Sequence, residues 1–232
     1  MRIAMHGTGT MGKTIRDIGG DKIVVFVDSI EEININEKID VVVDFSHFSK
    51  LNDLLDRCVE RNYPLVIATT GYSGETLEKI VEASKRIPIL LSSNTSLGIN
   101  AVNSILEKLV PKLEENFDIE IIEKHHNKKI DSPSGTAITL LETIQNSLHE
   151  KYDVVYGREG MAKREKKEIG VHAVRGGTIV GEHTIIFAGE DEIIEISHKA
   201  LSKKIFAVGA LKCADFIIGK QPRLYTMKDI FN

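Results

Sequence analysis

The chain of 232 residues has only two cysteines, no long apolar run and no excess of basic charge. Cys58 and Cys213 both lie in apolar, helix-like patterns, which is typical of buried free thiols in a reducing compartment rather than of a disulfide. No apolar stretch reaches the ~18 residues that a membrane span needs, and the N-terminus turns into a glycine loop too early for a signal peptide. We therefore expect a cytoplasmic protein with no membrane partner.

Charged residues are nearly balanced, with 30 Lys and Arg against 34 Asp and Glu and a formal net charge of −4. Nothing in this balance indicates nucleic acid as a partner. The sequence also has no Cys-x-x-Cys and no His-Glu-x-x-His, the spacings at which zinc ligands commonly occur. We therefore expect no metal site.

The first part of the chain alternates short apolar strands with helices, which is typical of a parallel sheet with helices on both faces. Strands are expected at residues 2–5, 23–27, 39–43, 65–68 and 87–91, and helices at 13–18, 48–62 and 74–86. The pattern changes after Ser96, which indicates a second domain.

The second part mixes helices with strands that follow one another directly. Helices are expected at 100–113, interrupted or ended near Pro111, and at 136–150, with a strand at 119–123 between them. From Glu168 the residues alternate as in strands, with hairpin turns predicted at 175–177 and 188–191. We predict an α/β fold with a Rossmann-type parallel-sheet domain at 1–96, to which 207–232 return, and an α+β domain with a mixed sheet at 97–206.

A glycine loop opens the first helix and predicts a dinucleotide site. Gly7-x-Gly9-x-x-Gly12 follows a strand, and Asp28 ends the next strand. The glycines allow the backbone to approach a pyrophosphate, and a carboxylate about 20 residues on can accept both ribose hydroxyls of NAD. Ser29, not arginine, follows Asp28. A carboxylate facing a 2′-phosphate without a counter-charge is unfavourable, so we predict that NADH is preferred and NADPH is also accepted.

Two further loops follow strands of the same predicted sheet, at Ala68-Thr69-Thr70 and Ser92-Ser93-Asn94-Thr95. Ligands of open parallel sheets bind beyond the carboxyl ends of the strands. Both loops are therefore candidates for the nicotinamide half, although Thr, Ser and Asn also favour ordinary turns.

The stretch EKHHNKKIDSPSGTA carries acid–base chemistry. His125 and His126 can exchange protons near neutral pH, and Lys129 can donate one. The turn Ser134-Gly135-Thr136 offers N–H groups and hydroxyls to a small anion. The two histidines could instead bind a metal, and Lys129 could pair with Asp131, alternatives that the residues leave open.

With these residues assembled, the chain resembles the dihydrodipicolinate reductase family along nearly its whole length. The shared segments are the loop ending Met11-Gly12, ATTG, SSNTSLGIN, IEIIEKHHNKKIDSPSGTA, YGREG, VRGGTIVGEHTIIFAGEDEIIEISHKA and MKDI. The resemblance implies hydride transfer from NAD(P)H to a cyclic dicarboxylate on the route to diaminopimelate and lysine. It also implies a homotetramer joined through the second domain, which would bind the substrate.

The resemblance assigns roles to individual residues. His125 matches the family's acid–base residue, Lys129 its proton donor and His126 a substrate contact. Gly135 and Thr136, beside Ser134, match the residues with which the family binds a substrate carboxylate. The residues that match its cofactor contacts are Gly7, Thr8, Gly9, Thr10, Met11, Gly12, Asp28, Ala68, Thr69, Thr70, Ser92, Ser93, Asn94 and Thr95. His6 departs from the pattern, because the family commonly has glycine there.

Two other functions compete with this interpretation. One is a different two-domain NAD-dependent oxidoreductase, such as an amino-acid dehydrogenase. The other is a non-catalytic dinucleotide sensor, which would keep the glycine loop but has no need of His125 and Lys129 beside a Ser-Gly-Thr turn.

Overall fold

The computed structural model describes residues 1–33 and 37–231, and the chain divides into two compact units. Unit 1 comprises Met1–Leu97 and Lys203–Asn232, and unit 2 comprises Gly98–Ser202. The last part of the chain therefore packs with the first. The predicted α/β class, with one parallel and one mixed sheet, is confirmed.

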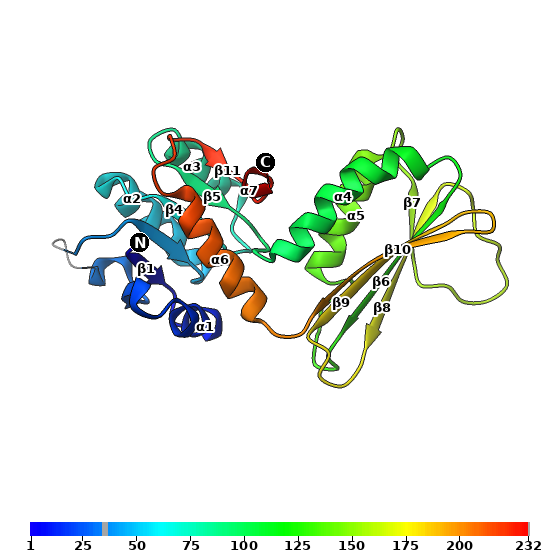
Figure 1. Ribbon diagram of the computed structural model, residues 1–232, viewed down its shortest axis with the longest axis horizontal. Helices are drawn as coiled ribbons and strands as arrows, with labels where there is room; N and C mark the ends of the chain where they lie inside the picture. Colours follow the sequence, from blue (N-terminus) through cyan, green and yellow to red (C-terminus); the bar gives the residue numbers. More distant parts are fainter. Residues whose placement is uncertain (34–36, 232) are drawn as a thin grey trace. The chain divides into compact units, whose positions relative to one another are not determined.

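In its described residues, unit 1 contains a six-stranded parallel sheet with the strand order β11-β5-β4-β3-β1-β2 (Figure 1). The strands are β1 (Ile3–His6), β2 (Ile23–Val27), β3 (Val41–Asp44), β4 (Leu65–Ile67), β5 (Ile89–Leu91) and β11 (Leu224–Tyr225). The strands β1, β3 and β4 are buried along their whole length, which explains why they read as continuous apolar runs.

Helices cover both faces of this sheet. One core lies under α2 (Leu51–Arg61) and α3 (Gly74–Ser84), and the other under α1 (Thr10–Gly19) and α6 (Lys204–Ile217) (Figure 1). Alternate residues of the strands point into the two cores, as the pleat requires. The short elements of this unit are η1 (Gly20–Lys22), η2 (Ile30–Glu32), η3 (Phe48–Lys50) and α7 (Lys228–Phe231).

In its described residues, unit 2 contains a five-stranded mixed sheet with the order β10-β9-β6-β8-β7. Its strands are β6 (Asp118–His125), β7 (Asp153–Tyr156), β8 (Glu168–Arg175), β9 (Gly181–Ala188) and β10 (Ile193–Ala200). The helices α4 (Leu97–Leu113) and α5 (Gly135–Ser147) lie side by side on one face and bury a third core (Figure 1).

One local prediction was wrong. The turn at Arg175-Gly176-Gly177 does not make a β-hairpin, because β6 lies between β8 and β9 in the sheet. Helix α4 ends at Leu113, close to Pro111, as predicted. Pro111 lies in the last turn, where the buried side chain of Val110 keeps the helix packed on the sheet. The turn at 188–191 does join an antiparallel pair, β9 and β10.

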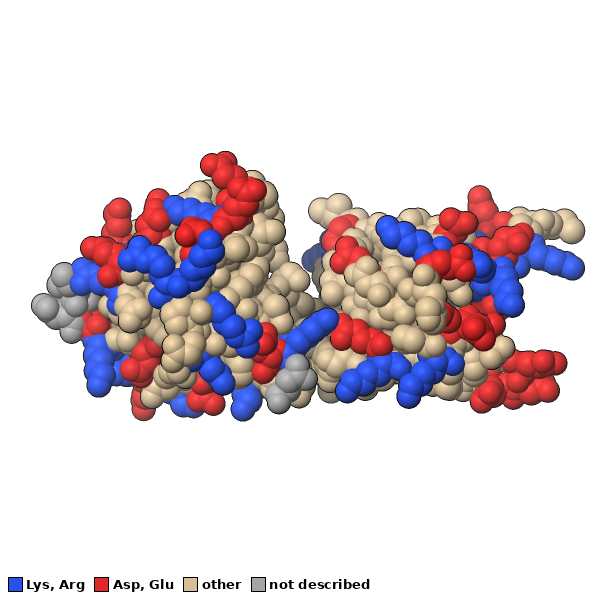
Figure 2. Space-filling model, turned by 90° about the horizontal axis from the view of Figure 1, so that it is seen from above, with Lys and Arg blue, Asp and Glu red and all other residues tan. Residues whose placement is uncertain are grey.

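The surface of each unit carries both signs of charge. Lys and Arg side chains are interspersed with Asp and Glu over the face drawn in Figure 2. Within the described residues, the helices are too short or too polar to cross a membrane.

Candidate active site

The carboxyl edge of the unit 1 sheet gathers the predicted cofactor residues. Because all strands of this sheet run parallel, the loops after β1, β2, β3, β4 and β5 lie at one edge. The chain passes to opposite sides of β1 when it forms β2 and β3, so the strand order reverses there. Such a reversal leaves a crevice in which α/β proteins bind ligands.

The glycine loop after β1 has a shape that other residues could not adopt. Gly7 has a φ of +107°, and a Cβ there would lie 2.5 Å from the Phe45 carbonyl oxygen. A Cβ on Gly12 would lie 1.8 Å from the Gly7 oxygen. Gly9 caps α1 without any side-chain hydrogen bond, and a Cβ there would meet no described atom within 4 Å. The space beside Gly9 at the start of α1 is therefore open, which fits a pyrophosphate.

The remaining predicted residues of this loop surround the start of α1. Thr10 is the first residue of the helix, and Met11 packs against the core under α1 and α6. Thr8 lies beside Asp28, since its N–H and hydroxyl each come within 3.4 Å of Asp28 Oδ1.

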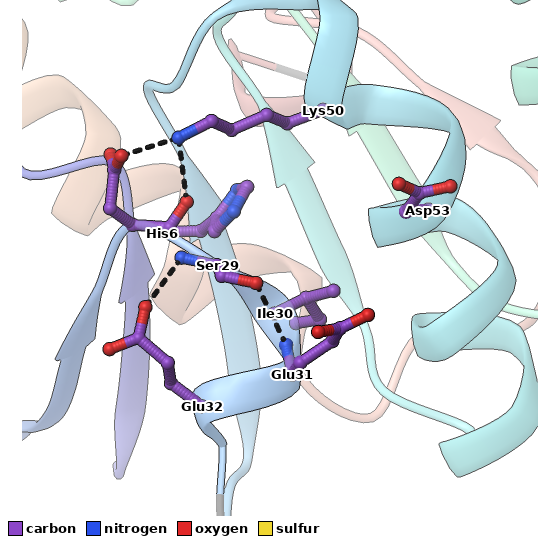
Figure 3. A pocket seen from close by; sticks show the side chains of 8 residues that line it. His6, Ser29, Ile30, Glu31, Glu32, Lys50 and Asp53 are labelled. Carbon is purple, nitrogen blue, oxygen red and sulfur yellow. Dashed lines mark hydrogen bonds and ion pairs between the residues drawn. The ribbon is translucent and has the colours of Figure 1, made fainter.

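Asp28 lies at the edge of a pocket of about 210 Å³. The lining residues are His6, Asp28, Ser29, Ile30, Glu31, Glu32, Lys50 and Asp53, most of which Figure 3 labels. Lys50 pairs with the Asp28 carboxylate, and this hydrogen bond together with that from the Thr8 N–H lowers the pKa of Asp28. Asp28 is therefore ionised and stands where the ribose-binding acid of a dinucleotide fold is expected.

The loops after β4 and β5 contain both buried and exposed residues. The hydroxyls of Thr69, Ser92 and Thr95 are used locally: they donate to the carbonyl oxygens of Ser46, Asn94 and Phe206 at 3.1, 2.8 and 2.8 Å. Thr70 and Ser93 are exposed, and Ala68 and Asn94 are half-buried. The hydroxyls of Thr69, Ser92 and Thr95 thus hold the two loops together, whereas Thr70 and Ser93 are exposed.

A buried histidine–aspartate pair lies at the same edge. His6 Nδ1 is 2.8 Å from Asp44 Oδ1, and both side chains are almost completely buried. Among the described residues, His6 Nε2 and Asp44 Oδ2 have no hydrogen-bond partner. The departure at position 6 therefore introduces a polar pair where β1 and β3 end.

In unit 2, His125 is held by a buried carboxylate. Glu123 and His125 lie two residues apart on β6, so their side chains point to the same face of the sheet. His125 Nδ1 lies 2.7 Å from Glu123 Oε2. Both terminal guanidinium nitrogens of Arg175 donate to Glu123, each at 2.7 Å, and the Ser134 N–H donates to it at 3.0 Å. Glu123 is fully buried yet has hydrogen-bond donors on both oxygens.

These contacts fix the charge of Glu123 and the orientation of His125. Burial alone would raise the pKa of Glu123, but the hydrogen bonds from Arg175, His125 and Ser134 outweigh it and lower the pKa. An ionised carboxylate only accepts, so Nδ1 of His125 carries a proton and Nε2 is left for proton exchange. A Cβ on Gly181 would lie 3.1 Å from this Nε2, so the glycine makes room for the ring.

His183 joins the acid–base residue to the Ser134 turn. Its ring meets the His125 ring edge-on with centroids 5.3 Å apart, and its Nε2 lies 3.0 Å from Ser134 Oγ. That oxygen also accepts the Ala137 N–H at 3.1 Å, which caps α5. Burial, followed by the charge of His125, lowers the pKa of His183 to about 4, so it is neutral at pH 7 and shares a hydrogen bond with the Ser134 hydroxyl.

The other predicted residues of this segment lie in the turn between β6 and α5. Lys129 Nζ donates to both carboxylate oxygens of Asp131, at 2.7 and 2.8 Å, so the ion pair that the sequence left open as an alternative is present. His126 is half-buried directly after β6, and Gly135 and Thr136 form the first turn of α5. Ser134 is buried, whereas Gly135 is exposed and Thr136 is half-buried.

Sequence reasoning missed four of these residues: Glu123, Arg175, His183 and Lys50. Glu123 could have been found from its place two residues before His125 on a strand, since such residues share a face. The other three come from distant parts of the chain, and no local pattern signals them. Among the described residues, no three His, Cys, Asp or Glu side chains gather closely enough to hold a metal ion.

Both parts of the chain match one known family. The family model "Dihydrodipicolinate reductase, N-terminus" matches residues 16–95, and "Dihydrodipicolinate reductase, C-terminus" matches residues 98–231. The chain belongs to the dihydrodipicolinate reductase family. It is an NAD(P)H-dependent oxidoreductase of diaminopimelate and lysine biosynthesis.

Individual relatives in the dihydrodipicolinate reductase family are similar over their whole length. The chain is 50% identical to the 4-hydroxy-tetrahydrodipicolinate reductase of Brachyspira hyodysenteriae, with 99% of each chain covered. It is 48% identical to the Clostridium tetani enzyme of the same name, with 100% of this chain and 97% of that one covered. Membership confirms the resemblance predicted from the sequence and sets aside both the amino-acid dehydrogenase and the non-catalytic sensor.

A solved structure shares the fold. Dipicolinate-bound dihydrodipicolinate reductase from Paenisporosarcina sp. TG-14 matches with a TM-score of 0.80 at 20% identity, over 97% of each chain. The dipicolinate is bound by that protein, and at this identity the likeness concerns the fold alone.

Proposed function

We propose that the chain reduces 4-hydroxy-tetrahydrodipicolinate to tetrahydrodipicolinate with NAD(P)H and a proton, and that the 4-hydroxyl group leaves as water. The observation that carries the proposal is the buried, ionised Glu123 that orients His125 beside the turn opening α5. Full-length relatives carry the name of this activity, and a structure of the same fold binds a related dicarboxylate.

Unit 1 would hold the dinucleotide. Gly7, Gly9 and Gly12 leave the start of α1 open for the pyrophosphate, and the Asp28 carboxylate can accept the ribose hydroxyls. The exposed parts of the loops after β4 and β5 would meet the remaining half of the cofactor. When bound, the reduced nicotinamide would supply the hydride.

Unit 2 would supply the proton that completes the reduction. His125 Nε2 can give or take a proton while Nδ1 stays on Glu123, so the ring keeps one orientation through the exchange. Lys129 is the proposed proton donor, and Asp131 holds its ammonium group in place. Two cationic donors near a dicarboxylate also stabilise negative charge as it develops.

The start of α5 would bind a substrate carboxylate. The proposed contacts are Ser134, Gly135 and Thr136, with His126 nearby. A helix N-terminus presents N–H groups and the positive end of its dipole, which favour an anion. The Ser134 hydroxyl would act indirectly, because it caps the helix and bonds to His183.

NADH is the proposed preferred cofactor. The pocket beside Asp28 is also lined by the carboxylates of Glu31, Glu32 and Asp53, and an additional phosphate would be repelled by this charge. Steady-state rates with both dinucleotides test the preference; a higher kcat/KM with NADPH would contradict it.

The proposed oligomer is a homotetramer built on the sheet of unit 2. Helices α4 and α5 cover one face of this sheet, whereas its other face carries exposed apolar side chains such as Val174 and Ile193. Light scattering coupled to gel filtration would give the mass.

We also propose a cytoplasmic location, which the buried thiols of Cys58 and Cys213 support, since burial raises the pKa of both and keeps them unreactive.

The activity test follows the absorbance of NADH with enzymatically generated substrate. His125→Gln and Lys129→Ala should each lower kcat by about 10²–10⁴-fold while cofactor binding persists. His149→Gln, at an exposed histidine of the same unit, is the matched control and should turn over normally. Wild-type protein that binds NADH but never oxidises it would refute the proposal.

A further inference from the structure

The Lys50 side chain reaches from the start of α2 to the end of β2. Its Nζ donates to the Asp28 carbonyl oxygen at 2.9 Å and pairs with the Asp28 carboxylate (Figure 3). The two residues are 22 positions apart in the sequence. The counter-charge that the residue after Asp28 does not provide is therefore supplied from another loop.

Lys50 is also isolated among negative charges. Of the described residues that line the pocket, it is the only lysine or arginine, and four carboxylates accompany it. Those carboxylates are Asp28, Glu31, Glu32 and Asp53. A ribose with two hydroxyls needs only acceptors here, whereas a ribose 2′-phosphate needs a cation.

We propose that Lys50 is the specificity-determining residue that allows this pocket to accept NADPH beside NADH. The inference rests on the proposed function, since it requires that the pocket holds the adenosine ribose. With NADH, Lys50 stays on Asp28. With NADPH, its flexible side chain turns to the 2′-phosphate.

The Lys50 side chain can turn from Asp28 to a 2′-phosphate easily, because neither Lys50 nor Asp28 is buried. The side chains of Lys50 and Asp28 are 38% and 54% exposed, and exposed ion pairs contribute little to stability. A lysine acts as a mobile point charge on a flexible stem, so it can serve either partner without a change in the backbone.

Direct binding separates the two cofactors. Fluorescence titrations of the full chain with NADH and with NADPH, without substrate, give both dissociation constants. Lys50→Met should weaken NADPH by at least about tenfold, the loss of one charge-assisted hydrogen bond, and leave NADH within about threefold. Lys50→Arg should keep NADPH binding. Asp28→Asn should weaken NADH and spare NADPH, because it frees the lysine.

Lys79→Met is the matched control, since Lys79 forms an equally exposed ion pair with Asp56 in the same unit. It should leave both dissociation constants unchanged. Equal weakening of NADH and NADPH by Lys50→Met, or unchanged NADPH binding, would overturn the role of Lys50. Failure of the wild-type chain to bind either dinucleotide would instead overturn the proposed cofactor site itself.

Discussion

Replacing His183 with glutamine should reduce the loss of stability that the protein suffers as the pH falls. His183 is only 4% exposed, and its pKa is lowered from 6.5 to about 4, first by burial and then by the charge of His125. The unfolded chain takes up this proton near pH 6.5, but the folded chain does so only near pH 4. Between these values the unfolded state binds more protons, so acid favours unfolding.

The size of the effect follows from the two pKa values. A shift from 6.5 to about 4 corresponds to about 3 kcal/mol of unfolding free energy, which is present in full above pH 6.5 and lost by about pH 4. Glutamine has no such proton to bind, and its amide group, which has both a donor and an acceptor, can still hydrogen-bond to the Ser134 hydroxyl. As the pH falls across this range, the unfolding free energy of the wild type should therefore decrease by about 3 kcal/mol more than that of His183→Gln.

Urea unfolding followed by circular dichroism, at pH steps between about 7 and 4, measures this difference. The exposed His47, replaced by glutamine, is the control and should keep the wild-type slope. Ring resonances in NMR titrations give the pKa of His183 directly. Parallel wild-type and His183→Gln curves would refute the reasoning, because they would mean that this ring takes up its proton equally in both states.

Three further substitutions test other parts of the structure. Glu123→Gln keeps the shape but removes the charge that orients His125, so we expect kcat to fall by up to about 10²-fold in the NADH assay, and an unchanged kcat would contradict this. Gly12→Ala places a Cβ 1.8 Å from the Gly7 oxygen, so NADH titrations should show binding at least about tenfold weaker; normal affinity would rule out close packing of this loop. Leu106→Ala empties a fully buried site and should cost about 2–5 kcal/mol of unfolding free energy in urea, whereas a loss below ~1 kcal/mol would show that the core closes over the gap.

Local patterns were enough to predict most of the fold. The strand at 23–27 has the bounds that its five apolar residues gave, because each residue fits a sheet and the charged residues Lys22 and Asp28 border it. The turn at Arg175 was misjudged for a physical reason. A turn between two strands makes a hairpin only if the strands pair, and here β6, which comes much earlier in the chain, lies between them.

The candidate site likewise contains residues that the sequence predicts and others that it does not. His125, Lys129 and Ser134 could be predicted because they are polar, reactive and close in sequence. Their supports could not: Arg175 lies 52 residues from Glu123, and His183 lies 49 residues from Ser134. Such contacts depend on strand order and register, which only tertiary packing decides.

The division of the chain also dictates an order of assembly during translation. Unit 1 needs residues from both ends of the chain, because α6 covers one face of its sheet with Ala207, Ala210 and Cys213. At about 5–20 residues per second, the ribosome completes unit 2 before this helix has emerged. One face of the nascent unit 1 sheet must then stay uncovered until the final segment has been synthesised. Stalling or premature termination shortly after residue 202 would therefore leave an aggregation-prone intermediate that depends on chaperones.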